Sequence, residues 1–139
     1  MLVLDTNVIS ELLRPTPSLA VVRWFKAQQR ATLFITALTQ AELLEGVARL
    51  PKGKRQTELA TAVQGVLAED FADQVLPFDG PAAACYADIA ASRRRSGRPL
   101  AIFDGLIAGI CRARSMALAT RNGDDFTDCG VSLVDPWRA

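Results

Sequence analysis

The chain has 139 residues, with 16 basic and 15 acidic side chains, a formal net charge of +1 and no histidine. Its length is that of one domain, since domains usually contain about 100–200 residues. The missing histidine excludes Ser-His-Asp triads, Cys-His pairs and metal sites built on imidazole. No apolar run in the sequence approaches the roughly 18 residues that span a bilayer, so no membrane partner is expected.

Short apolar strands alternate with helical patterns along the chain. Residues 2–4 predict a buried strand that ends at Asp5, and residues 6–13 predict a helix that stops at Pro15 and Pro17. Further helices are expected at 18–29, opened by Ser18, at 39–50, opened by Thr39, and at 55–71, 81–95 and 101–114; further strands are expected at 33–36, 75–78, 116–120 and 131–134. This order predicts one α/β domain over residues 1–139 with a mainly parallel sheet.

The three cysteines point to a reduced compartment. They are odd in number, lie far apart in the sequence and form no CxxC pair, so a zinc site is not expected. The N-terminal residues MLVLDTN lack the basic segment of a signal peptide. Both observations favour a cytoplasmic protein with free thiols.

Asp5 and Asn122 are expected at one rim of the sheet. Asp5 ends the first strand, and Asn122 lies just beyond the strand that ends at Thr120. Ligands of parallel sheets bind beyond the carboxyl ends of the strands, so a site would form at this rim. A purely structural role for Asp5, as the cap of the following helix, is an equal alternative at this point.

Two further acids have apolar neighbours. Glu42 follows Thr39 by three residues, which is the capping-box pattern, and taken alone the spacing favours capping. Asp104 shares a helix face with small residues, which would let that face approach another element or a ligand closely. The opposite, packed stripe of the same helix is expected to contain Ile102, Phe103, Leu106, Ile107 and Ile110.

Taken together, the three acids suggest a metal site. Asp5, Glu42 and Asp104 can converge on the rim of the sheet, where clustered carboxylates repel one another unless they take up protons or meet a counter-charge. Mg²⁺ and Mn²⁺ prefer oxygen ligands, and a carboxylate site of this kind serves phosphodiester hydrolysis.

The motifs around these acids resemble those of PIN-domain nucleases. They are LDTNVISE at 4–11, TQAEL at 39–43 with Gly46, DGLIA at 104–108, ATRNGDDF at 119–126 and VDPW at 134–137. The last two resemble the ending of VapC-type and FitB-type toxins of bacterial toxin–antitoxin pairs. The resemblance covers essentially the whole chain and implies a three-layer α/β/α domain.

The resemblance also implies an activity and a set of site residues. The activity is that of a Mg²⁺- or Mn²⁺-dependent endoribonuclease whose products end in 5′-phosphate and 3′-hydroxyl. The fourth acidic position of the family is an asparagine here, which leaves a second metal in doubt. The residues that match are Asp5, Glu42 and Asp104 as metal ligands, Asn122 at the fourth position, Asp125 as a partial substitute for the missing charge, and Thr6 and Thr120 as supporting hydroxyls.

The family implies partners as well. Such toxins resemble homodimers that bind a small antitoxin, and DNA is contacted only indirectly, through the antitoxin. An RNA substrate predicts basic residues near the acids. The candidates are Arg93, Arg94, Arg95, Arg98 and Arg121; a second basic cluster lies at Lys52, Lys54 and Arg55.

Two other functions remain open from the residues. A haloacid-dehalogenase-like phosphatase also has an apolar strand that ends in an aspartate, here Asp5, but it gives no role to Glu42 or Asp104. A non-catalytic PIN fold, kept for partner binding and weakened by Asn122, is the second alternative.

Overall fold

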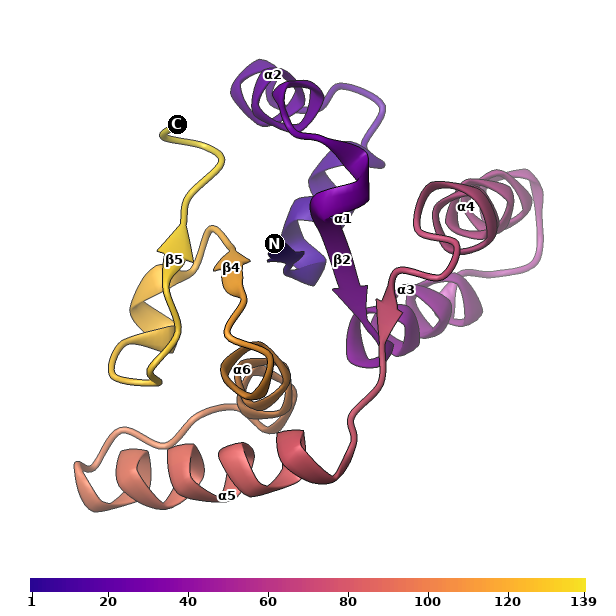
Figure 1. The fold of residues 1–139 in the computed structure, drawn as a ribbon. Helices are drawn as coiled ribbons and strands as arrows, with labels where there is room; N and C mark the ends of the chain where they lie inside the picture. Colours follow the sequence, from indigo (N-terminus) through magenta and orange to yellow (C-terminus); the bar gives the residue numbers. More distant parts are fainter.

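The computed structural model describes all residues, 1–139, and has a five-stranded sheet at its centre (Figure 1). The strand order is β3-β2-β1-β4-β5, and every neighbouring pair is parallel. The strands are β1 (Leu2–Leu4), β2 (Leu33–Thr36), β3 (Val75–Leu76), β4 (Ala117–Ala119) and β5 (Leu133–Val134). The mainly parallel sheet predicted from the sequence is therefore confirmed, although β3, β4 and β5 are shorter than predicted.

Six α-helices connect the strands. They are α1 (Thr6–Leu12), α2 (Leu19–Ala27), α3 (Ala37–Arg49), α4 (Lys54–Gly65), α5 (Gly80–Arg95) and α6 (Ile102–Ala113). The predicted fourth helix ends earlier than residue 71, because the chain widens into a π-helical turn at Val66–Asp70. None of these helices is long and apolar enough to cross a membrane.

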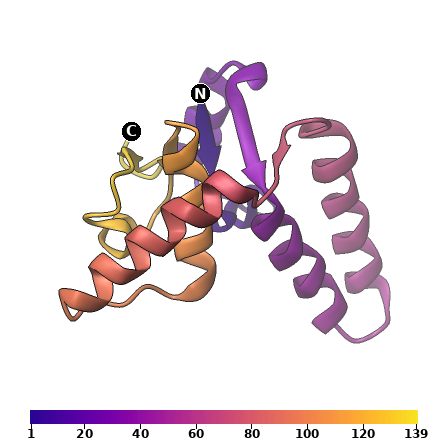
Figure 2. The ribbon, with the colours of Figure 1, turned by 60° about the horizontal axis from the view of Figure 1, so that its bottom comes forward.

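Alternating side chains divide the interior into two cores. Val3 and Leu118 pack on the side of α5 and α6, whereas Leu4 and Ala119, their neighbours along the same strands, pack on the side of α1 and α3. Successive residues of a strand point to opposite faces of its sheet, so this alternation places helices on both faces. Figure 2 shows α5 crossing α6 on one side, and α3 and α4 running side by side on the other. The result is the expected three-layer α/β/α fold.

The packing of α6 agrees with the prediction only in part: Ile107 and Ile110 are buried as expected, but two other members of the predicted stripe are not. Ile102 is 67% exposed and Phe103 41% exposed, so neither belongs to a packed stripe. The helix instead buries Gly105 and Gly109 against α5, and a Cβ atom added at Gly109 would lie 2.7 Å from the carbonyl oxygen of Ala82. The expected close approach of the small-residue face is confirmed.

Candidate active site

Asp5 is both a helix cap and a buried carboxylate. Its Oδ1 accepts a hydrogen bond from the backbone N–H of Thr6 at 2.8 Å, which caps α1, and its Oδ2 accepts one from the hydroxyl of Thr120 at 2.8 Å. The side chain is only 6% exposed. Burial raises the pKa of Asp5, the two hydrogen bonds oppose that rise, and the nearby charge of Asp125 adds to it. The two alternatives for Asp5 are thus compatible, because one carboxylate caps the helix and also faces the rim.

Glu42 does not cap its helix. α3 begins two residues before Thr39, and its N-cap is Thr36, whose hydroxyl accepts from the backbone N–H of Thr39 at 3.2 Å. The capping-box prediction was therefore wrong, because Thr36 occupies the cap that Thr39 was expected to fill. The Glu42 side chain, which is exposed, instead accepts a hydrogen bond from the hydroxyl of Thr6 at 2.8 Å.

The hydrogen bond from Thr6 to Glu42 also fixes the direction of the bond between the hydroxyls of Thr6 and Thr39. The Thr6 and Thr39 hydroxyl oxygens lie 2.8 Å apart. A hydroxyl has one proton to donate. Since Thr6 gives its proton to Glu42, Thr39 donates to Thr6. The predicted supporting role of Thr6 is thus exerted through its hydroxyl on Glu42 and through its backbone N–H on Asp5.

Asp104 lies in the first turn of α6 with its carboxyl group near the other acids. Its pKa is raised to about 6, first by burial and then by the negative charges of Asp5, Asp125 and Glu42. Asp5, Glu42 and Asp104 also line one pocket. The structure therefore brings together the three acids that the sequence singled out.

Asn122 follows β4 on the same rim. Its backbone N–H donates to the Thr120 hydroxyl at 3.1 Å, and the side-chain amide of Asn7 donates to that hydroxyl at 3.3 Å. Asp125 follows in a short 3₁₀ turn, where its backbone N–H donates to the carbonyl of Asn122 at 3.0 Å. Asn122 thus lines the same pocket as the three acids, and the negative charge of Asp125 acts on Asp5 and Asp104.

These side chains surround an open pocket of about 460 Å³. Only one of its lining residues, Trp137, is hydrophobic. Its lining consists of Asp5, Thr6, Asn7, Ser10, Glu11, Arg14, Glu42, Asp104, Arg121, Asn122 and Trp137. The pocket is polar and acidic, which suits a cation and a phosphate rather than an apolar ligand.

The possible metal ligands in this pocket suit a hard divalent ion. Apart from Arg14, Arg121 and Trp137, the lining side chains offer oxygen atoms of carboxylates, amides or hydroxyls, which are the ligands that Mg²⁺ and Mn²⁺ prefer. No group of three or more Asp, Glu, His or Cys side chains is arranged in this structure to hold a metal ion. A Mg²⁺ ion here would therefore take one or two carboxylates as ligands, together with waters and substrate phosphates.

Five lining residues were not predicted as site residues from the sequence: Asn7, Ser10, Glu11, Arg14 and Trp137. Ser10, Glu11 and Arg14 lie on α1 or just after it, at helical spacing from Thr6 and Asn7, and this spacing could have identified them. Trp137 comes from the end of the chain, and no local pattern connects it to the acids.

Arg93 is buried in this fold and offers little surface to a nucleic acid. It is 5% exposed, and its guanidinium donates to the carbonyl oxygens of Arg98 and Thr127 and to the sulfur of Cys129. Its predicted role in RNA binding was therefore wrong, because Arg93 ties the end of α5 to the loop before β5. Arg94, Arg95 and Arg98 are exposed but do not line the acidic pocket.

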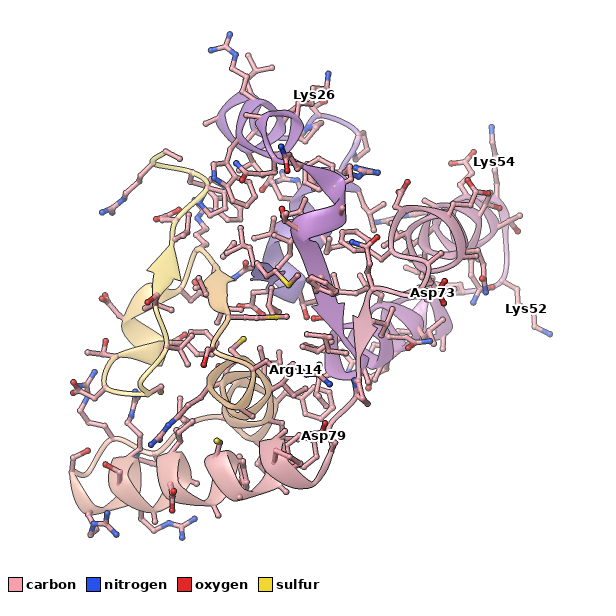
Figure 3. The ribbon with its side chains drawn as sticks, viewed as in Figure 1. Lys26, Lys52, Lys54, Asp73, Asp79 and Arg114 are labelled. Carbon is pink, nitrogen blue, oxygen red and sulfur yellow. The ribbon has the colours of Figure 1, made fainter.

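Other charged side chains also lie outside the acidic pocket. Figure 3 shows Lys52 and Lys54 at the turn between α3 and α4, where they project from the molecule. It also shows Asp79 and Arg114 close together, in agreement with their 3.4 Å ion pair. Among the predicted basic candidates, only Arg121 lines the pocket.

Comparison with known proteins identifies the fold family. The PIN domain family matches residues 2–130. "VapC ribonuclease Y4jK" of Sinorhizobium fredii is 42% identical over 137 residues, which cover 99% of this chain and 98% of that protein. "Toxin FitB" of Neisseria gonorrhoeae is 39% identical, with 99% of each chain covered. The solved structure titled "Crystal Structure of FitAcB from Neisseria gonorrhoeae" superposes with a TM-score of 0.93 over 100% of both chains, at 39% identity. This chain therefore belongs to the PIN-domain family.

Proposed function

We propose that the chain is the toxin of a type II toxin–antitoxin pair and that it cleaves RNA phosphodiester bonds with the help of a divalent metal ion. The observation that carries this proposal is the group of three acids, Asp5, Glu42 and Asp104, which line one polar pocket. The names of the relatives, a ribonuclease and a toxin, support it.

Asp5, Glu42 and Asp104 would hold Mg²⁺ or Mn²⁺, with Asn122 or Asp125 beside them. When bound, the ion lowers the pKa of a water molecule and neutralises charge on the scissile phosphate. The chain itself positions the acids, since Thr120 holds Asp5 and Thr6 holds Glu42. Asn122 offers an amide that can orient the attacking water, with Asp125 as the alternative.

The phosphatase and the non-catalytic PIN fold are not equally compatible with these findings. Membership of the PIN-domain family argues against a haloacid-dehalogenase-like phosphatase, and the pocket also includes Glu42 and Asp104, to which that chemistry gives no role. A non-catalytic PIN fold would keep the same architecture, so only an activity measurement separates it from a nuclease.

Partners follow from the same proposal. Solved structures of this fold include a complex titled "Structure of FitAB bound to IR36 DNA fragment", at 39% identity and a TM-score of 0.92. By analogy, the chain would bind a small antitoxin, form a homodimer and reach DNA only through the antitoxin. A cytoplasmic location fits the three free cysteines.

The decisive experiment is cleavage of total RNA by the purified chain with Mg²⁺, with Mn²⁺ and with EDTA. Asp5→Ala and Asp104→Ala should abolish cleavage that depends on the metal. Asp88→Ala, which removes an exposed carboxylate of α5 outside the pocket, is the matched control and should cleave normally. Full activity in both pocket variants, or none in the unaltered chain, would refute the proposed function.

A further inference from the structure

Arg121 and Trp137 form a pair at the edge of the acidic pocket. The guanidinium carbon of Arg121 lies 5.1 Å from the centre of the Trp137 ring, within the range of a cation–π contact. Both residues line the pocket that contains the three acids. Trp137 is itself fixed, because its backbone N–H donates to Asp135 Oδ1 at 2.9 Å.

Arg121 is the cation of this pocket that no carboxylate neutralises. The other lining arginine, Arg14, lies 3.4 Å from Glu11 and is paired with it. The guanidinium of Arg121 makes no ion pair within 4.0 Å, although the pocket contains four carboxylates. Its charge therefore remains available to an anionic ligand.

The backbone of Arg121 is tied to the residues that hold Asp5. The Arg121 N–H donates to Asn7 Oδ1 at 3.4 Å, and the amide of the same Asn7 donates to the Thr120 hydroxyl. That hydroxyl donates to Asp5. Because the turn after β4 carries both Thr120 and Arg121, the guanidinium is kept near the acids without binding to them.

We propose that Arg121, held against the indole of Trp137, binds the RNA phosphate that neighbours the scissile one. This inference rests on the proposed function. RNA entering a pocket of four carboxylates meets repulsion, and a bound metal relieves that repulsion only at the scissile phosphate. A planar guanidinium with free donors is suited to a second phosphate, which it can bind through two parallel hydrogen bonds. Trp137 is then a positioning residue that acts through Arg121.

The first test compares three variants in RNA cleavage. Arg121→Gln should raise KM about tenfold, with a smaller change in kcat, because it removes a contact to a non-reacting phosphate. Arg121→Lys keeps the charge but loses the planar guanidinium, so its KM should lie between those of the unaltered chain and Arg121→Gln. The control is Arg23→Gln, which removes an exposed arginine of α2 that lies outside the acidic pocket and forms no ion pair; this variant should match the unaltered chain.

The second test measures RNA binding without cleavage. A short, labelled single-stranded RNA of mixed sequence is titrated with the Asp104→Asn protein in Mg²⁺ at several salt concentrations. Removing one phosphate contact lowers the slope of log affinity against log salt by about 0.7 for a single strand. Arg121→Gln should show this loss, and Arg23→Gln should keep the full slope. A merely structural role of Arg121 would weaken binding without changing the slope.

The third test addresses Trp137. The chain has two tryptophans, so Trp24→Phe leaves Trp137 as the single indole fluorophore, and the same RNA should change its emission. Trp137→Phe keeps an aromatic face and should retain most of the affinity, whereas Trp137→Leu should lose several-fold. Because Trp137 also packs against the core, circular dichroism must show that the leucine variant is folded. If it is not, the phenylalanine variant and the fluorescence signal decide.

The outcomes separate this inference from the proposed function. If the unaltered chain cleaves no RNA, the proposed function fails, while the binding slope still tests Arg121. If the chain cleaves RNA but Arg121→Gln leaves KM and the salt slope unchanged, the phosphate site is refuted. That holds even if the variant binds an antitoxin less tightly, because Arg121 would then serve the protein partner and not RNA.

Discussion

The hydroxyl of Thr120 donates a hydrogen bond to Oδ2 of Asp5 at 2.8 Å, between residues 115 positions apart in the sequence. The same oxygen accepts from the side chain of Asn7 at 3.3 Å and from the backbone N–H of Asn122 at 3.1 Å. With two donors aimed at its oxygen, the hydroxyl can direct its one proton only to Asp5. Thr120 thus joins the ends of β1 and β4 at the point where the site forms.

Replacing Thr120 with valine, which keeps the shape but removes the hydroxyl, should damage both stability and activity. Asp5 would lose a hydrogen-bond partner in a buried setting, at a cost of about 1–3 kcal/mol in the free energy of unfolding, and the N–H of Asn122 would lose its partner as well. Losing a group that orients a metal ligand typically lowers metal affinity or activity by about 10–100-fold. Urea unfolding and RNA cleavage at varied Mg²⁺ measure the two effects.

Thr120→Ser is the matched control, because it restores the hydroxyl. It should recover most of the cleavage activity even though it removes a methyl group from the core. If the serine variant were as inactive as the valine variant, the hydroxyl would not be what holds Asp5.

Asp104→Asn should stabilise the metal-free protein at neutral pH. The pKa of Asp104 is about 6 in the folded chain and 3.8 without the fold. The folded state therefore holds the proton more tightly, and ionising Asp104 above pH 6 destabilises it. Allowing for solvent screening of this half-buried group, removing its charge should add about 1 kcal/mol, or a few degrees in Tm.

The stabilisation by Asp104→Asn should depend on pH, because only the ionised form of Asp104 destabilises the fold. In EDTA, the Tm advantage of Asp104→Asn should be largest above pH 7, shrink as the pH falls through 6, and vanish near pH 4, where both states are protonated. Added Mg²⁺ should raise the Tm of the unaltered chain more than that of the variant. An advantage that grew on acidification would contradict the charge clustering.

Asn122→Asp tests the missing fourth acid. The new carboxylate would lie beside Asp125 and the other acids, so it should lower the Tm in EDTA by repulsion and raise the affinity for Mg²⁺ or Mn²⁺ by about tenfold through its extra ligand charge. Isothermal titration with each metal measures the affinity. Ser92→Asp adds the same charge on the exposed side of α5, outside the pocket, and should leave metal binding unchanged. Equal metal affinity in Asn122→Asp and the unaltered chain would place residue 122 outside the metal site.

The position of the site at the rim of the sheet could be predicted from the sequence. The hydrogen-bond partners of Glu42 and Arg93 could not. Asp5 and Asn122 follow strands, and parallel strands place their carboxyl ends together. The capping role that the spacing alone favoured for Glu42 was wrong, because Thr36 and Thr39 offer equally good caps and only the backbone decides between them. The burial of Arg93 was not predictable, because its partners include two backbone carbonyls, which carry no signal in a sequence.

The contact between α5 and α6 gives a paired prediction on glycines. A Cβ atom at Gly109 would lie 2.7 Å from the carbonyl oxygen of Ala82 and 3.1 Å from the backbone nitrogen of Tyr86. Because backbone atoms cannot move aside as a flexible side chain does, Gly109→Ala should lower the free energy of unfolding by about 1–3 kcal/mol. It should also reduce RNA cleavage, since α6 carries Asp104.

Gly46→Ala is the same substitution in the interior of α3, where the added Cβ would meet nothing within 4 Å. Because the added methyl group meets no neighbour there, only the higher helix propensity of alanine acts, and the free energy of unfolding should rise by about 0.5–1 kcal/mol. Urea unfolding followed by circular dichroism compares the two variants directly. Opposite signs are expected because only Gly109 lies at a close helix contact, and a Gly109→Ala variant as stable as the unaltered chain would show that α5 can withdraw from α6 without cost.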